Sequence, residues 1–481
     1  MCKKILFYLT VILVLCDVYY SFTQHYNSKL DGDIPESVLP LPYIEPVFAD
    51  PFGVKTIIDN NPHAAPNRFF SHYFEYLWFN SVPFLLQKVA DPIHSVYIAS
   101  GLYKTIIQIL LIYLLAVFCF GTFAPFRQQK HWLVILFFCA LFQSCGKVRS
   151  MGIIDPAVTY TFFYAMPLLF LLLYLLPFIF EEFYNKKVFR HKIITVIWCI
   201  VFGLLSNFSG PVNTGTALVF IAVMFLRYAY LYCNQNKEKL NIKDFFAFIP
   251  KSFWKYLLPL GVVALYSLYL GTYNTMYSNP IPLKARFSLL PKGIFEMFIN
   301  NFGFSILTLG CIINTILLLK SEDKDNKQAA SIFGWILLFS FIYILLLPFG
   351  GYRPYRPYII RYDTVICISF AFIFYAGYST KILFENSLKN KIPRRIYIAY
   401  IIIFAGYFFV IDNPTAWRNN AEKKALYKIA KSEDNPVILD NKTSIISWGT
   451  ITDVAESKRV SKCLQRWGIT KQAKLFYYKP E

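Results

Sequence analysis

The sequence predicts an all-α polytopic membrane protein, a bundle of about eleven transmembrane helices. Of its 481 residues 56% are hydrophobic and only 16% are charged, whereas about a quarter of a soluble globular chain is charged. Apolar runs of membrane-spanning length recur almost from end to end. The net charge of +20 comes from lysines and arginines clustered in short loops between these runs. Such loops orient membrane proteins, and no nucleic-acid motif is present. The predicted partner is therefore the lipid bilayer and not nucleic acid.

The N-terminal run, "MCKKILFYLTVILVLCDVYY", has basic residues followed by an apolar stretch, as a signal peptide has. No small-x-small cleavage site follows it. We therefore predict an uncleaved signal anchor, residues 1–22, that forms the first transmembrane helix.

A bundle of about ten further helices is predicted between residues 104 and 412. With the first span at 4–22, the others are expected at 104–124, 131–146, 158–180, 191–207, 211–232, 255–273, 302–320, 331–348, 362–379 and 395–412.

The charge of the loops predicts the orientation. If the N-terminus is cytoplasmic, the inner segments hold 22 lysines and arginines and the short outer loops hold 8. This asymmetry agrees with the positive-inside rule. The N-terminus is thus expected in the cytoplasm and the C-terminus outside. Two large segments, the first loop (23–103) and the C-terminal tail (413–481), are then extracytoplasmic.

These two outer segments have different patterns. The first loop contains "NRFFSHYFEYLWFNSVPFLLQKVADP", whose aromatic crowding and isolated charges are typical of helices lying in the membrane interface. Such helices either guide a lipid-linked substrate or only shield the bundle. The tail has an extended run "NPVILD", an amphipathic run near Asp453–Trp467 and a final "AKLFYY". We expect a small α/β unit there.

The outer loop "GGYRPYRPYIIRYD" holds three arginines, although outer loops are normally poor in arginine. Proline favours an extended polyproline II backbone with three residues per turn, so Arg353 and Arg356 would share one edge. Guanidinium groups grip phosphate oxygens bidentately. We predict a phosphate- or donor-binding site of Arg353, Arg356 and Arg361. The alternative is that they anchor the loop to ordinary lipid phosphates and that Arg361 pairs with Asp363.

Other outer residues are candidates for the same cavity. Lys147 and Arg149 in "CGKVRSMGIIDP" would add positive charge to the phosphate site. Polar groups at membrane depth need partners or a wet cavity. The candidates for lining the cavity are therefore the side chains of Tyr352, Tyr355, Asn207 and Asn213. For the two asparagines a tight turn with capping residues is the alternative.

The motif "DGD" follows the first helix on the predicted outer side. Asp31 and Asp33 are carboxylates on either side of a glycine. They are candidate catalytic residues, because one can act as a general base toward a hydroxyl, or both can converge on a divalent cation such as Mg²⁺ or Mn²⁺. The alternative is a helix start, with Asp33 as the N-cap and Pro35 in the first turn.

These features together resemble the polyprenyl-phosphate-dependent GT-C glycosyltransferases. The matching features are the outer "DGD", the interfacial-type run "FFSHYFEYLWF", about eleven spans and an outward tail. The resemblance implies that Asp31 or Asp33 is the base or metal ligand and that Arg353, Arg356 and Arg361 hold the donor phosphate. It also implies inverting transfer of a sugar to a glycan, lipid or protein acceptor of the cell envelope. The location implied is the inner membrane of a bacterium.

Three other functions fit parts of the pattern. A polymerase or ligase of lipid-linked glycans also uses outer arginines, and it would tolerate loss of both aspartates. A transporter or flippase leads one to expect paired half-repeats and charges at the bilayer midplane. The third alternative is an envelope scaffold whose tail binds a partner.

Overall fold

The computed structural model describes residues 2–142, 153–236, 241–276, 281–300, 302–351, 358–388, 390–411 and 418–479. Within these ranges nine helices are long and apolar enough to cross a membrane. Two shorter apolar helices, α8 (Gln129–Leu141) and α11 (Lys192–Asn207), fall at the other two predicted spans. The prediction of an all-α polytopic membrane protein is therefore confirmed in its coarser form.

The nine long helices are continuous or extended by a short 3₁₀ or π-helical segment. They are made of α1 (Cys2–Tyr26), α7 (Pro92–Phe120), α9 (Val158–Tyr160) with η2 (Thr161–Ala165) and α10 (Met166–Tyr184), α12 (Pro211–Gln235), η3 (Phe253–Leu257) with α14 (Leu258–Gly271), α16 (Phe302–Leu319), α17 (Lys324–Leu346) with η4 (Leu347–Gly350), α18 (Ile366–Ile382) with η5 (Leu383–Ser387), and α19 (Lys391–Ile411). The connecting helices of the bundle are η1 (Pro125–Arg127), α13 (Ile242–Phe248) and α15 (Leu283–Asn300).

The first loop forms five short helices and ends earlier than predicted. They are α2 (Ile34–Val38), α3 (Glu45–Ala49), α4 (Val54–Ile58), α5 (Phe69–Phe79) and α6 (Val82–Leu86). The next long helix begins at Pro92 because Asp91 caps it: the Asp91 carboxylate accepts hydrogen bonds from the amides of Ile93 (3.0 Å) and His94 (3.2 Å). Proline at the first helical position suits this cap.

The C-terminal tail is a small α/β unit. It contains α20 (Asn420–Lys431), β1 (Val437–Leu439), η6 (Val454–Ser457), α21 (Lys458–Arg466) and β2 (Phe476–Tyr478), and its two strands pair in parallel. The runs "NPVILD" and "AKLFYY" supply the strands, as their sequences indicated.

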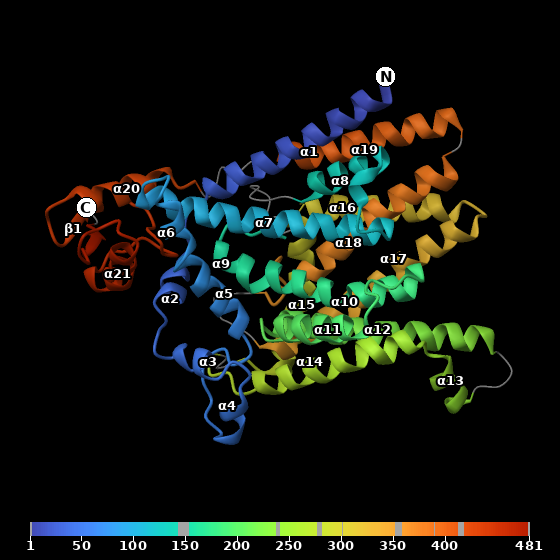
Figure 1. The fold of residues 1–481 in the computed structure, drawn as a ribbon, viewed down its shortest axis with the longest axis horizontal. Coiled ribbons are helices and arrows are strands. Elements are labelled where there is room, and N and C mark those ends of the chain that lie inside the picture. The colour runs from blue at the N-terminus through green and yellow to red at the C-terminus, as the bar shows by residue number, and fades with distance from the viewer. Residues whose placement is uncertain are drawn as a thin grey trace.

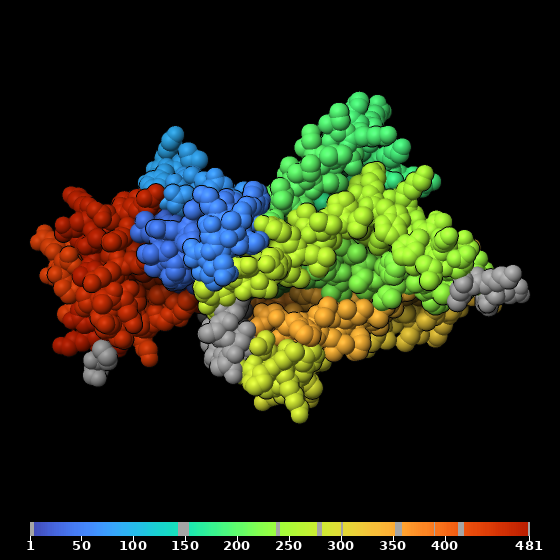
Figure 2. Space-filling view, turned by 90° about the horizontal axis from the view of Figure 1, so that it is seen from below, coloured from blue at the N-terminus to red at the C-terminus, as the bar shows by residue number. Residues whose placement is uncertain are grey.

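The first loop and the tail gather at the same end of the bundle, while the N-terminus and α13 lie at the other end (Figure 1). Figure 2 shows the loop, in blue, packed against the tail, in red. Trp467 anchors this contact: it is fully buried, and its indole N–H donates to the carbonyl of Phe79 at the end of α5 (3.0 Å). Gln87 donates back to the carbonyl of Trp467 (2.7 Å).

The loops predicted to be cytoplasmic meet at the opposite end through ion pairs. Lys130 of α8 contacts Glu385 of η5 (2.8 Å) and Lys255 of η3 contacts Glu181 of α10 (3.1 Å), which joins helix ends distant in sequence. These ion pairs thus lie away from the first loop and the tail, and the orientation of the chain in the membrane stays a prediction.

This separation makes the topology testable by labelling. In a background without native cysteines, Asn61→Cys in the first loop should react with a membrane-impermeant maleimide in intact cells. Lys187→Cys, exposed between α10 and α11, should react only after permeabilisation. The reverse pattern would mean that the N-terminus is outside and that the loop and tail are cytoplasmic.

Candidate functional site

The first acid of "DGD" is buried against the helix α9. Asp31 has no exposed surface. Its carboxylate accepts hydrogen bonds from the hydroxyl (2.7 Å) and the amide (3.1 Å) of Thr159, and from the amide of Asp33 (3.2 Å). Burying an ionised carboxylate is costly unless it is hydrogen-bonded, and these donors offset that cost.

A second buried carboxyl group reaches the same hydroxyl. Glu75, from α5, lies 2.5 Å from the Thr159 hydroxyl and accepts a hydrogen bond from Ser37 (2.6 Å) at its other oxygen. A threonine hydroxyl has one proton, so it donates to only one of the two carboxyl groups, and the other must carry a proton to donate to it. We infer that Asp31 and Glu75 hold one shared proton across Thr159.

The electrostatics of this pair agree with the geometry. Burial, and then the charge of Asp33, raises the pKa of Asp31 to about 6. Burial, and then the charge of Asp31, raises the pKa of Glu75 well above its ordinary value. Two carboxyl groups in one dry site cannot both ionise without a large cost.

The second acid has a different environment. Asp33 occupies the N-cap position of α2, with Pro35 in the first turn, but its side chain does not cap the helix. Instead its carboxylate accepts a hydrogen bond from the indole N–H of Trp448 in the tail (2.8 Å). Asp33 is half-buried, so it is the more exposed acid of this motif.

The tail holds the chain on the N-terminal side of this turn. The buried carboxylate of Glu422 accepts from the amide of Leu30 (3.1 Å), the hydroxyl of Tyr97 (2.8 Å) and the amide of Ile446 (2.8 Å). The Asn419 side chain donates to the carbonyl of Tyr26 (2.7 Å). Burial raises the pKa of Glu422 to about 7. The turn is therefore fixed between the bundle and the tail.

Tyr160 connects the acids to Arg361. It directly follows Thr159, and its ring centroid lies 5.7 Å from that of Trp448 and 5.7 Å from that of Tyr164. The guanidinium carbon of Arg361 lies 5.8 Å from the Tyr160 centroid, within the range of a cation–π contact. Trp448, which binds Asp33, and Arg361 therefore both contact the Tyr160 ring.

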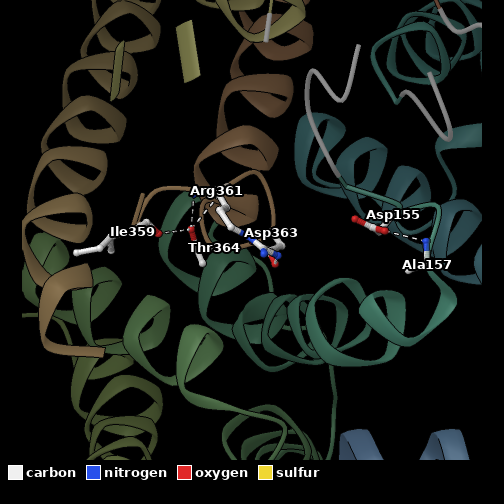
Figure 3. Close-up of polar contacts among 6 residues, drawn as sticks. All are labelled: Asp155, Ala157, Ile359, Arg361, Asp363 and Thr364. Atoms are coloured by element: carbon white, nitrogen blue, oxygen red, sulfur yellow. Dashed lines mark hydrogen bonds and ion pairs between the residues drawn. The ribbon is translucent and has the colours of Figure 1, made fainter. Parts of the chain in front are cut away.

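Arg361 pairs with Asp363, as the alternative interpretation proposed. Its Nε donates to Asp363 (2.9 Å), and its Nη2 also contacts that carboxylate. Its backbone amide donates to Thr364 (2.9 Å), whose hydroxyl also contacts the carbonyl of Ile359 (Figure 3). Nη1 of Arg361 makes no hydrogen bond with any residue that the structure describes, so this ion pair leaves donors for a second anion.

The segment before Thr159 lies across from this loop. Asp155 accepts a hydrogen bond from the amide of Ala157 (2.7 Å), and its carboxyl group points toward the side on which Arg361 and Asp363 lie (Figure 3). Buried Lys104, from α7, donates to the carbonyl of Pro156 (2.9 Å). These bonds fix the entry into α9 and hence the position of Thr159.

A cavity of about 430 Å³ lies next to the segment that carries Arg361, with Ile359 and Thr364 in its wall. It is bounded by the first half of α12, by α14, by the end of α17 with η4, and by residues 358–364. Most of its lining is apolar, and its polar lining residues include Arg68, Tyr164 and Thr364. Tyr164 of the cavity wall contacts Tyr160, so one wall residue touches the ring that also contacts Trp448 and Arg361.

Several predicted site residues lie outside the described residues: Lys147, Arg149, Tyr352, Arg353, Tyr355 and Arg356. Asn207 and Asn213 are described and buried. The Asn207 amide donates to the carbonyl of Gly203 within α11 (2.8 Å), and the Asn213 amide of α12 donates back to the carbonyl of Ser206 at the end of α11 (2.9 Å). Neither lines the cavity.

The described residues do not bring together a set of metal ligands. No group of three or more histidine, cysteine, aspartate or glutamate side chains that could hold a metal ion occurs among them. Both oxygens of Asp31 face protein donors. Asp31 therefore offers no unoccupied oxygen to a cation in this arrangement, and the divalent cation considered for Asp31 and Asp33 stays a prediction.

Sequence reasoning did not assign Glu75, Thr159, Tyr160 or Trp448 to the site. Glu75 carried a usable signal: a lone carboxylate within "FFSHYFEYLWF" needs a buried partner if its helix packs inward. The partners themselves are distant in sequence, and the pattern gave no indication of their pairing.

Comparison with known proteins adds no assignment. No family model matches the chain, and no curated protein or solved structure matches it significantly.

The shared proton makes stability depend on pH. Asp31 and Glu75 bind protons more tightly in the folded chain, so their contribution to the free energy of unfolding is greatest below about pH 4 and falls as pH rises through about 6. For Asp31 this amounts to about 3 kcal/mol. Glu75→Gln removes one ionisable group, so it should flatten this pH dependence, measured by thermal unfolding in nanodiscs.

Glu433→Gln, which changes an exposed carboxyl group of the tail, is the matched control and should leave the pH dependence unchanged. An unchanged pH dependence in Glu75→Gln would contradict the shared proton.

Proposed function

We propose that the chain is an integral membrane glycosyltransferase that moves a sugar from a polyprenyl-phosphate donor to an extracytoplasmic acceptor. One observation supports this above the others. Tyr160 contacts Trp448, which binds the half-buried carboxylate of Asp33, and it contacts Arg361, whose Nη1 has no hydrogen-bond partner among the described residues. It also contacts Tyr164 in the wall of a largely apolar cavity. These are the three elements that transfer from a lipid phosphate requires.

In this proposal Asp33 is the general base and Asp31 is a positioning residue. Asp33 is half-buried and reachable, whereas Asp31 is fully buried and bound on both oxygens. Asp31 fixes the turn by accepting from the Asp33 amide (3.2 Å). A general base must lie within hydrogen-bond reach of the proton that it takes, which a fully buried acid does not.

Arg361 and the cavity would bind the donor. The Nη1 donors of Arg361 suit a phosphate oxygen, and Asp363 holds the guanidinium in place. The cavity walls, which include Leu218, Leu268 and Leu346, suit the start of an isoprenoid chain. Arg353 and Arg356 remain proposed contacts of the same phosphate.

The reaction balances with these groups alone. Asp33 takes the proton from the acceptor hydroxyl or amine as that atom bonds to the anomeric carbon of the sugar. The bond between the anomeric carbon and the phosphate oxygen breaks, and the polyprenyl phosphate leaves with its electron pair, stabilised by Arg361. Attack opposite the leaving group inverts the anomeric centre.

The base assignment predicts the effect of Asp33→Asn. Cells lacking the gene should lack one sugar in their surface glycans or glycolipids, as measured by mass spectrometry. Asp33→Asn at matched membrane levels should restore that sugar about 10²–10⁴-fold more slowly than wild type, the usual contribution of a general base. Control Glu433→Gln should restore it fully.

Full rescue by both Asp33→Asn and Asp31→Asn would favour a polymerase or ligase of lipid-linked glycans. An unchanged glycan profile after deletion would reject transfer and favour a transporter or a scaffold.

The cavity assignment predicts that filling it blocks the donor. Gly215 lines the cavity, and a Cβ atom placed there meets no atom within 4 Å. Gly215→Leu should keep or raise stability, because leucine favours the helix by up to about 1 kcal/mol, yet it should reduce sugar transfer at least about tenfold. Control Gly406→Leu, equally unhindered in α19, should have no effect on transfer. Normal transfer by Gly215→Leu would exclude the cavity as the lipid site.

A further inference from the structure

Trp448 is an exposed aromatic side chain held at the candidate site. It lies in the tail between β1 and η6, and 48% of its surface is exposed although its N–H donates to Asp33. The other tail tryptophan that the structure describes, Trp467, is fully buried and serves the docking of the tail. The ring of Trp448 is thus left partly exposed, although enclosing it would bury more apolar area and stabilise the fold.

Backbone contacts on both sides of Trp448 hold its side chain beside Asp33. Ile446 has a φ of 46°, which is unfavourable for a β-branched residue, and its amide donates to buried Glu422. Ser447 donates to the carbonyl of Gly449 (2.7 Å). At Gly32, between the two acids, a Cβ atom would lie 2.6 Å from both Cδ1 and the backbone nitrogen of Trp448. The glycine of "DGD" is therefore required for the close approach of this loop.

The neighbours of the ring supply groups that recognise a sugar. The Asp33 carboxylate lies at its edge, and the Tyr160 ring lies beside it with an interplanar angle of 36°. Arg361 lies over Tyr160. An aromatic face binds the apolar C–H face of a pyranose, while adjacent carboxylate and guanidinium groups bind its hydroxyls.

We propose that Trp448 is the platform on which a pyranose ring packs, so that the tail completes the sugar site. This inference rests on the proposed function and deepens it, because it assigns sugar recognition to a residue of the tail. The sugar is either the donor's or the terminal sugar of an acceptor glycan.

Two substitutions separate the two roles of Trp448. Trp448→Phe keeps an aromatic face and removes the N–H that Asp33 accepts. Trp448→Gln keeps an N–H donor and removes the aromatic face. Ile438→Ala, which shortens a tail side chain of similar exposure (47%) on β1, is the matched control.

The test is saturation-transfer NMR on the full chain in nanodiscs. The probes are the methyl α- and β-pyranosides of glucose, galactose, mannose and N-acetylglucosamine. At least one should receive saturation from the wild-type protein. Trp448→Gln should weaken its binding about tenfold, whereas Trp448→Phe should weaken it about threefold or less, as the value of an aromatic contact indicates.

Competition distinguishes the two sources of the sugar. If a polyprenyl phosphate carrying the same sugar displaces the methyl pyranoside, the platform binds the donor. If both bind together, the platform binds the acceptor.

The inference is overturned if no pyranoside of the panel binds, or if Trp448→Gln binds as wild type does. Its failure is distinct from failure of the proposed function. If sugar binding depends on Trp448 but deletion of the gene leaves the glycan profile unchanged, sugar transfer is rejected and the platform is kept. If sugar transfer depends on Asp33 but sugar binding does not depend on Trp448, the proposed function is kept and the platform is rejected.

Discussion

The hydrogen bonds between Asp31 and Thr159 are the contact on which the site depends. They bury a carboxylate of the first loop against the start of α9, and a buried carboxylate must be paired wherever it lies. Glu75 of α5 also hydrogen-bonds to the Thr159 hydroxyl. The tail contacts the same turn through Glu422, which accepts a hydrogen bond from the amide of Leu30. The first loop, the bundle and the tail therefore meet at one turn.

Most of the fold could be predicted because its signals are local. Each of the eleven predicted spans contains an apolar helix, since length and hydropathy are properties of one continuous segment. The start of α7 was misplaced, although Asp91 and Pro92 together form a readable helix start. The strands of the tail were also readable, but their parallel pairing depends on residues far apart in the chain.

The site was less predictable because its contacts join distant segments. Asp31 and Asp33 could be found because two acids follow a membrane helix, and Arg361 because arginine is unusual in an outer loop. Nothing local in "IIDPAVTYTFFYAMP" or "ISWGT" indicates that Thr159 would meet Asp31 or that Trp448 would meet Asp33. The sequence also left open which of the two acids is accessible, and burial decides that in favour of Asp33.

The two acids of one short motif lie in opposite environments, and in the proposed function this difference suits Asp33 as the general base. Asp31 is fully buried and shares a proton with Glu75, so its carboxyl group is only partly ionised and is out of reach of a substrate. Asp33, two residues later, is turned toward the tail and bound by a neutral indole N–H, which leaves it accessible. In the proposed function the two carboxyl groups therefore take different roles. Gly32 permits this division, because only a residue without a side chain lets Trp448 approach between them.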